Sequence, residues 1–147
     1  MSYDRRSVLA AALAVPAATT LLTATPAAAA PGTVDAQPWT DLLLEPGVTA
    51  QANAKPQIRL ITIAGTTFLQ ARGAITCDLT ADTRIATMPG VLKPTSVTRA
   101  VAPRNNSQGI NSCRLEISTT GAVTVYGGNT GNPVTWVQLD SVQTIWR

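Results

Sequence analysis

Side chains that could do chemistry are scarce in this sequence. Its 147 residues contain no histidine and two cysteines, which excludes Ser–His and Cys–His catalytic pairs, histidine-ligated metals and a four-thiolate zinc site. The closest acid pair, Asp78 and Asp82, falls short of the roughly 6–8 oxygens that calcium takes. A glycosidase needs two carboxylates at a fixed separation beneath a cleft, whereas the acids here are scattered. We predict no catalytic residue, no metal and no cofactor.

Cys77 and Cys113 are the only thiols, and each adjoins a predicted strand. In an exported protein an oxidising environment favours their pairing. The disulfide would close a loop of about 36 residues and stabilise the fold by roughly 3–4 kcal/mol. The alternative is two buried thiols that pack as small apolar side chains. We predict the disulfide.

The charge balance argues against nucleic acid as a partner. Eleven Lys and Arg against eight Asp and Glu give a net charge of +3, and charged residues make up 13% of the chain. Such a low fraction does not supply the many phosphate contacts that nucleic-acid binding requires.

Uncharged amide side chains concentrate in two segments, 104–112 and 127–133, which we predict to be loops. Loops on a rigid scaffold often carry binding, and unpaired amides suit the recognition of sugar or protein. The alternative is plain turns in solvent. The predicted binding residues are Asn105, Asn106, Gln108, Asn111, Asn129 and Asn132.

Residues 1–30 have the composition of an export signal. A polar start ending in Arg5 and Arg6 is followed by an alanine-rich run and by four consecutive alanines, 27–30. These are the charged, apolar and cleavage regions of a signal peptide. Two prolines interrupt the run, so it is not a membrane-spanning helix. We predict cleavage after residue 29 or 30, with cleavage after Ala36 as an alternative.

The twin arginine and the weakly apolar run resemble a twin-arginine (Tat) signal. Asp4 stands where that signal usually has Ser or Thr, while Val8 and Leu9 keep its apolar pair. The resemblance implies secretion by the Tat route, with no membrane contact after cleavage. The alanine-rich segment, together with the Tat signal, resembles those of secreted proteins from actinobacteria.

The rest of the chain predicts an all-β protein. Period-two alternation recurs between turn signals, for example at 58–63, where Arg59, Ile61 and Ile63 share one face, and at 114–118. Eight to nine short strands favour an antiparallel β-sandwich or jelly-roll over residues 39–147. A helix is expected only at 40–45 or in short turns.

Two features near the ends of this domain suggest assembly with a partner. The segment 31–38 predicts an extended N-terminal arm, which is either disordered or adds to a partner as a strand. Pro38, Trp39 and the penultimate Trp146 are the predicted assembly residues, with the ring of Trp146 expected on a contact surface. The alternative for the tryptophans is a place in the core.

Six short motifs follow one another along residues 39–146. They are WTDL (39–42), PQIR (56–59), FLQARGAI (68–75), IATMPG (85–90) with KP (93–94), LEI (115–117) with TG (120–121), and WVQLDSV (136–142). Their order resembles the C-terminal head domain of tail-fibre and receptor-binding proteins of tailed phages. The resemblance implies a compact β-sandwich, usually trimeric, that binds carbohydrate or protein on a host surface. It also implies that Arg72 lies in the interior or on a trimer axis. We therefore expect Arg72 to pair with an acid such as Glu116 or Asp140, and the alternative is a guanidinium presented to an acidic or sugar ligand.

The chain departs from that family because it has its own export signal and no fibre stem. We therefore predict a secreted, non-enzymatic binding or adaptor module that docks a protein partner or a cell-surface glycan. One such role is a small subunit of an extracellular toxin-type particle, and a homotrimer is possible. The alternatives are a small carbohydrate-active enzyme, or a protease inhibitor that uses the segment 104–112 beside Cys113.

Overall fold

The structure, a computed structural model, describes residues 32–147, apart from the side chains of Asn106 and Ser107. The predicted export signal with Arg5 and Arg6 lies outside the described residues. The described strands are β1 Val34–Ala36, β2 Thr40–Asp41, β3 Leu43–Leu44, β4 Thr49–Ala50, β5 Gln57–Ile63, β6 Thr66–Arg72, β7 Ala74–Leu79, β8 Thr83–Thr87, β9 Thr98–Ser107, β10 Ile110–Ile117, β11 Ala122–Tyr126, β12 Val134–Gln138 and β13 Gln143–Ile145. The predicted all-β class is confirmed.

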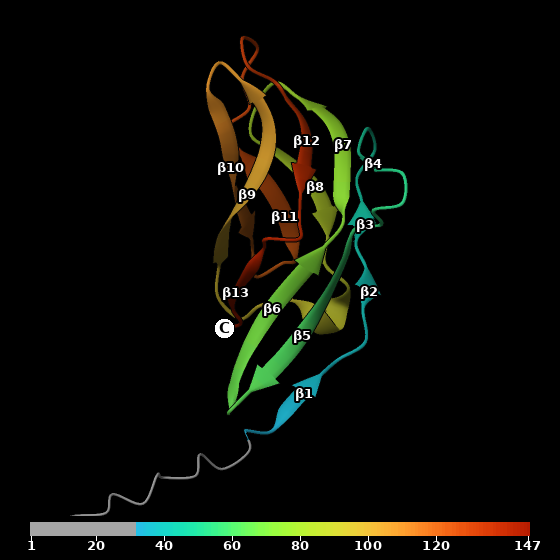
Figure 1. Cartoon of the computed structure of the whole chain (residues 1–147), viewed down its shortest axis with the longest axis vertical. Coiled ribbons are helices and arrows are strands. Elements are labelled where there is room, and N and C mark those ends of the chain that lie inside the picture. The colour runs from blue at the N-terminus through green and yellow to red at the C-terminus, as the bar shows by residue number, and fades with distance from the viewer. Residues whose placement is uncertain (1–31) are drawn as a thin grey trace, which may run out of the picture. The chain divides into compact units, whose positions relative to one another are not determined.

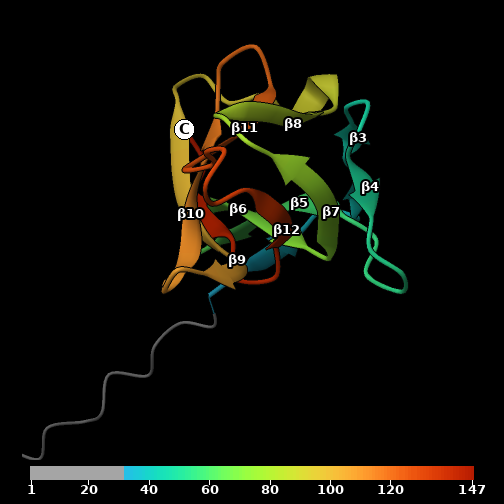
Figure 2. The same ribbon diagram turned by 90° about the horizontal axis from the view of Figure 1, so that it is seen from above.

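The strands form two antiparallel sheets. The smaller sheet has the order β1-β5-β6-β13, with β2 also paired to β5, and the larger has the order β3-β8-β11-β10-β9-β12-β7-β4. In Figure 1 the smaller sheet lies at the lower end, and the β9–β10 hairpin reaches the upper end. Figure 2 shows from above how the strands of the larger sheet curve around a common interior.

One apolar core lies between the sheets. Leu115 and Ile117 of β10 stand opposite Val125 and Val123 of β11, and all four side chains are buried, as their alternation predicts. Leu69 of β6 joins the same cluster from the smaller sheet. The two sheets are thus joined by shared apolar contacts.

Gly73 marks the point where the chain leaves one sheet and enters the other, between β6 and β7. Its φ is +91°, and a Cβ atom placed there would lie 2.2 Å from the carbonyl oxygen of Lys55 and 2.6 Å from that of Ala54. Only glycine fits such an approach of two backbones. A glycine within a strand pattern often marks a bulge or a close approach of another backbone, and here it marks a close approach.

Two local predictions are wrong. The apolar segment 40–45 forms the short strands β2 and β3 instead of a helix, because it finds partners in β5 and β8. The segment 104–112 is not an open loop: β9 continues through Pro103, and β10 begins at Ile110. Pairing with a neighbouring strand therefore overrides the stop signal of the proline. No helix in the described part of the chain is long and apolar enough to cross a membrane.

The arm 31–38 is part of the fold within its described residues. Its β1 pairs with β5, with Val34 opposite Ile63 and Ala36 opposite Ile61. All three residues of β1 are nevertheless exposed, because the strand forms an edge of the smaller sheet.

Candidate functional site

The two amide-rich segments meet at one end of the larger sheet. Gln108, at the tip of the β9–β10 hairpin, donates a hydrogen bond of 2.8 Å to the carbonyl oxygen of Gly131. Asn105 Oδ1 accepts a hydrogen bond of 2.8 Å from the backbone N–H of Thr135. Segments more than 20 residues apart in the chain are thereby held together.

Arg104 is the centre of this end, although the sequence pattern assigns it to a loop in solvent. Its side chain is 1% exposed. The guanidinium donates to the carbonyl oxygens of Gly127 at 2.9 Å and Pro133 at 2.8 Å, and to Asn132 Oδ1 at 2.8 Å. Its Nε has no hydrogen-bond partner among the described residues. The arginine therefore closes the loop 127–133 onto the sheet.

Most of the predicted binding amides are used within this end of the molecule. Asn129 Oδ1, for example, accepts from the N–H of Gly131 at 3.0 Å. Asn111 is exposed, and the side chain of Asn106 lies outside the described residues. The prediction of unpaired amides is wrong for Asn105, Gln108, Asn129 and Asn132. A tight loop leaves its backbone groups without ladder partners, and amide side chains supply them.

The predicted disulfide is not formed in this structure, where Cys77 and Cys113 are free, buried thiols. Cys77 Sγ donates to the carbonyl oxygen of Val134 at 3.2 Å, and Cys113 Sγ donates to that of Ala102 at 3.5 Å. Each thiol thus packs against its own neighbouring strand. This is the alternative stated for the sequence, in which two buried thiols pack as small apolar side chains.

We expect both thiols to be unreactive in the folded protein. Burial raises the pKa of Cys77 and of Cys113 to about 11, so only about one thiol in a thousand is ionised at pH 8. Ellman's reagent should titrate two thiols in guanidinium chloride and almost none without it, and dithiothreitol should leave the melting temperature unchanged. A native mass about 2 Da below the reduced mass, with a melting temperature lowered by reductant, would instead show that the disulfide forms.

The outer face of the smaller sheet is polar at one end. Arg59 Nε donates to Gln70 Oε1 at 2.9 Å, and Arg72 Nε donates to Gln57 Oε1 at 2.9 Å. The ring of Trp39 lies 4.4 Å from the guanidinium carbon of Arg59 and 4.3 Å from that of Arg72, which are cation–π distances. We call this set the Trp39 cluster: Trp39, Gln57, Arg59, Gln70 and Arg72.

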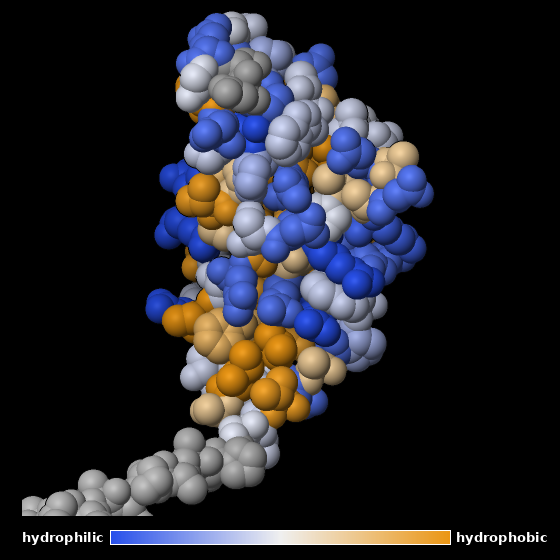
Figure 3. Space-filling model, in the orientation of Figure 1, coloured by the Kyte–Doolittle hydropathy of each residue, from blue (hydrophilic) through white to orange (hydrophobic). Residues whose placement is uncertain are grey.

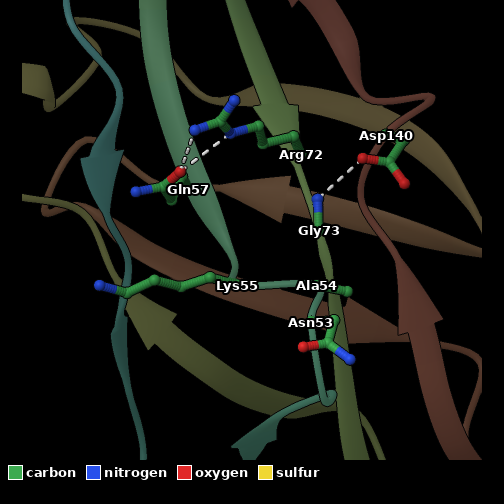
Figure 4. A pocket seen from close by; sticks show the side chains of 7 residues that line it. All are labelled: Asn53, Ala54, Lys55, Gln57, Arg72, Gly73 and Asp140. Carbon is green, nitrogen blue, oxygen red and sulfur yellow. Dashed lines mark hydrogen bonds between the residues drawn. The ribbon is translucent and has the colours of Figure 1, made fainter.

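An open hollow of about 370 Å³ adjoins the Trp39 cluster. Figure 4 shows Arg72 beside Gln57 on one side of it, and Asp140 on the other, accepting from the N–H of Gly73 at 2.8 Å. The lining residues are Asn53, Ala54, Lys55, Gln57, Arg72, Gly73 and Asp140. Polar groups thus gather where the chain switches sheets.

The expected interior position of Arg72 is wrong, because its side chain is exposed on the outer face. It donates to Gln57, and its charge contributes to the lowered pKa of Asp140. A position on a trimer axis stays a prediction. Glu116 bonds to Arg99 at 2.7 Å. The outer face of β6 is open to solvent, which the sequence of one strand does not reveal.

The carboxylates near the hollow are unsuited to acid catalysis. A hydrogen bond from Gln138 and another from the N–H of Gly73 lower the pKa of Asp140. Hydrogen bonds from Lys55 and Gln57 lower the pKa of Asp41. Both groups are ionised at neutral pH and have no proton to give. No three metal-ligating side chains cluster within the described residues.

The other end of the same outer face is apolar. Figure 3 shows apolar side chains gathered at the lower end of the molecule, where β1, β5, β6 and β13 lie. Strand register puts the residues on one face: Val34 opposite Ile63, and Ile145 opposite Phe68. Val34 is 62%, Ile63 38% and Ile145 47% exposed. We call this the apolar face: Val34, Ala36, Ile61, Ile63, Phe68 and Ile145, of which Ile61 is buried and Phe68 is partly buried.

The predicted assembly residues fall in different surroundings. Pro38 is exposed, and Trp39 belongs to the cluster described above. Trp146 is half-buried and packs partly against the core, and its place on a contact surface stays a prediction. Side chains alternate along β13, and Ile145 faces outward.

Comparison with solved structures shows the fold. The receptor-binding protein of Listeria phage PSA matches 80% of this chain with 67% of its own, at 16% identity and a TM-score of 0.56. The head domain of lactococcal phage bIL170 matches 75% of this chain with 92% of its own, at 18% identity and a TM-score of 0.44. No protein-family model and no curated protein matches. The phage-head resemblance of the sequence is thus confirmed at the level of fold.

Proposed function

We propose that the chain is a secreted, non-enzymatic binding module that docks a partner protein through the apolar face. The exposure of Val34, Ile63 and Ile145 on one side of a sheet carries the proposal. Soluble proteins rarely leave adjoining apolar side chains open to water unless a partner covers them. A paired sheet also holds these side chains in place before binding, which reduces the entropy lost on association.

The neighbouring polar groups support binding instead of catalysis. Asp41 and Asp140 are held ionised by hydrogen bonds, and the sequence supplies no histidine to act as a base. A module that acts by contact, follows a Tat-type signal and has a phage-head fold suits an adaptor in an extracellular particle. In that role one surface meets the particle and another meets the target.

A cell-surface glycan is the second candidate ligand, favoured by the Trp39 cluster. Sugar sites combine planar polar side chains with an aromatic ring, and here Trp39 stands beside Arg72, Gln57 and the hollow that contains Asp140. The glycan would meet this polar end, while the apolar face meets protein. Both ligands could then be held on one outer face.

Affinity purification of the tagged protein from culture supernatant of its producer tests the proposal. The parent should bring down a stoichiometric protein partner, identified by mass spectrometry. The double variant Ile63→Glu/Ile145→Glu should reduce that recovery at least about tenfold, since charge on an apolar contact opposes its desolvation.

The matched control is Val101→Glu/Ile110→Glu, which alters two exposed apolar residues of the larger sheet and should keep the partner. Equal recovery with both double variants would refute docking on the apolar face. A lone species that sticks to cell walls, and is released by Trp39→Ala, would favour the glycan instead. Light scattering of the purified parent separates a homotrimer from a captured partner.

A further inference from the structure

The outer edge of β1 has backbone groups turned away from the sheet. Gln37 N–H donates to the carbonyl oxygen of Leu60 at 2.9 Å, and Ala64 N–H donates to that of Thr33 at 3.3 Å. Hydrogen-bonding residues alternate along an antiparallel strand. The N–H and C=O groups of Val34 and Ala36 therefore point outward, and within residues 32–147 β1 ends the order of the sheet.

Side chains give this edge a pattern of its own. Val34 and Ala36 project to the apolar face, in line with Ile63 and Ile61. Asp35 projects to the opposite side, opposite Thr62, and is exposed. An added strand would thus place two apolar side chains beside the apolar face and, between them, one side chain beside Asp35.

The charge of Asp35 disfavours a second copy centred on this residue and favours a basic strand. A second copy that paired β1 with β1 about Asp35 would match Val34 to Ala36 on both sides. It would also put the two Asp35 carboxylates opposite each other, and like charges directly opposite destabilise a strand pair. A strand with Lys or Arg at that position instead gains an opposite-charge pair.

We propose that β1 is an acceptor edge for an extended segment of another protein with the pattern apolar–basic–apolar. This inference rests on the proposed docking function and names the chemistry of the partner. Main-chain bonds to Val34 and Ala36 supply the pairing, the apolar face takes the flanking side chains, and Asp35 selects the basic one. Pro38 has no N–H to offer, so the added strand is short.

Two fluorescein-labelled peptides test the proposal on the full chain. One is Gly-Thr-Val-Lys-Val-Thr-Gly, and its twin has Glu in place of Lys. Fluorescence anisotropy at low salt should show the Lys peptide binding at least about tenfold more tightly than the Glu peptide. The variant Asp35→Lys should reverse that order.

Ala36→Pro removes the outward N–H without touching a bond to β5, and prolines are tolerated at such edge positions. It should abolish binding of the Lys peptide, while the control Ala36→Val, which keeps the N–H, should bind as the parent does. Thermal unfolding of both variants near the parental temperature confirms that β1 is in place. If Ala36→Pro itself does not fold, the Asp35→Lys reversal decides alone.

Equal affinity for the two peptides, or full binding by a folded Ala36→Pro protein, would overturn the inference. The two proposals can fail separately. If the partner is lost with Ile63→Glu/Ile145→Glu but kept with Ala36→Pro, the docking function is supported and the acceptor edge is refuted.

Discussion

Replacing Gly73 with alanine should prevent the chain from reaching its native arrangement of sheets. The methyl group would lie 2.2 Å from one backbone carbonyl oxygen and 2.6 Å from the next, and backbone atoms cannot turn aside as a flexible side chain can. The positive φ of 91° adds strain. Gly73 also donates to Asp140 and accepts from the N–H of Leu139. We expect a loss above about 4 kcal/mol, which a small domain hardly survives.

Gly65→Ala is the matched control for this variant. Gly65 also has a positive φ, +81°, but nothing lies within 4 Å of its added Cβ atom. The expected cost is about 1 kcal/mol, from the backbone conformation alone. Soluble yield and urea unfolding followed by circular dichroism would measure both variants. Similar losses at the two glycines would show that the close approach at Gly73 is not the cause.

Replacing Arg104 with methionine should cost about 3–5 kcal/mol. Methionine fills a similar volume but leaves the carbonyl groups of Gly127 and Pro133, and the side chain of Asn132, without their donor. Each buried acceptor left unsatisfied costs about 1–3 kcal/mol. Arg104→Lys should recover only part of the loss, because an ammonium group lacks the planar fork that reaches several acceptors.

Arg99→Met controls for the loss of a positive charge. Arg99 is exposed and bonds to Glu116 at 2.7 Å, so its removal should cost less than about 1 kcal/mol. Guanidinium unfolding of the three variants gives the comparison. An Arg104→Met protein within about 1 kcal/mol of the parent would mean that the loop 127–133 finds other donors or water.

These variants also separate stability from binding. The end that Arg104 holds together lies at the opposite end of the domain in Figure 1 from the apolar face. A folded Arg104→Lys protein should therefore still capture a partner that docks on the smaller sheet.

What the sequence determined by itself is local. The alternation in 114–118 and in the strand after Gly121 predicts that Leu115, Ile117, Val123 and Val125 face inward, and all four are buried. The short turn at Ala64 and Gly65 is equally local, because both residues take positive φ and join the paired strands β5 and β6. Such features depend on residues a few positions apart, so one chain segment contains the information.

Only the tertiary structure decided which strand faces are covered and which side chains meet. The pattern in 58–63 separates two faces of β5, but both faces carry isoleucine. Ile58 is buried in the core cluster with Leu69. The face with Arg59 and Ile63 is therefore the outer one. Arg104 sits in a polar stretch and is buried because acceptors 23 to 29 residues further along the chain converge on it. Cys77 and Cys113 are free thiols, and each hydrogen-bonds to a carbonyl oxygen of its own neighbouring strand. The burial of a side chain and its hydrogen-bond partners depend on segments that are distant in the sequence, so a local pattern cannot predict them.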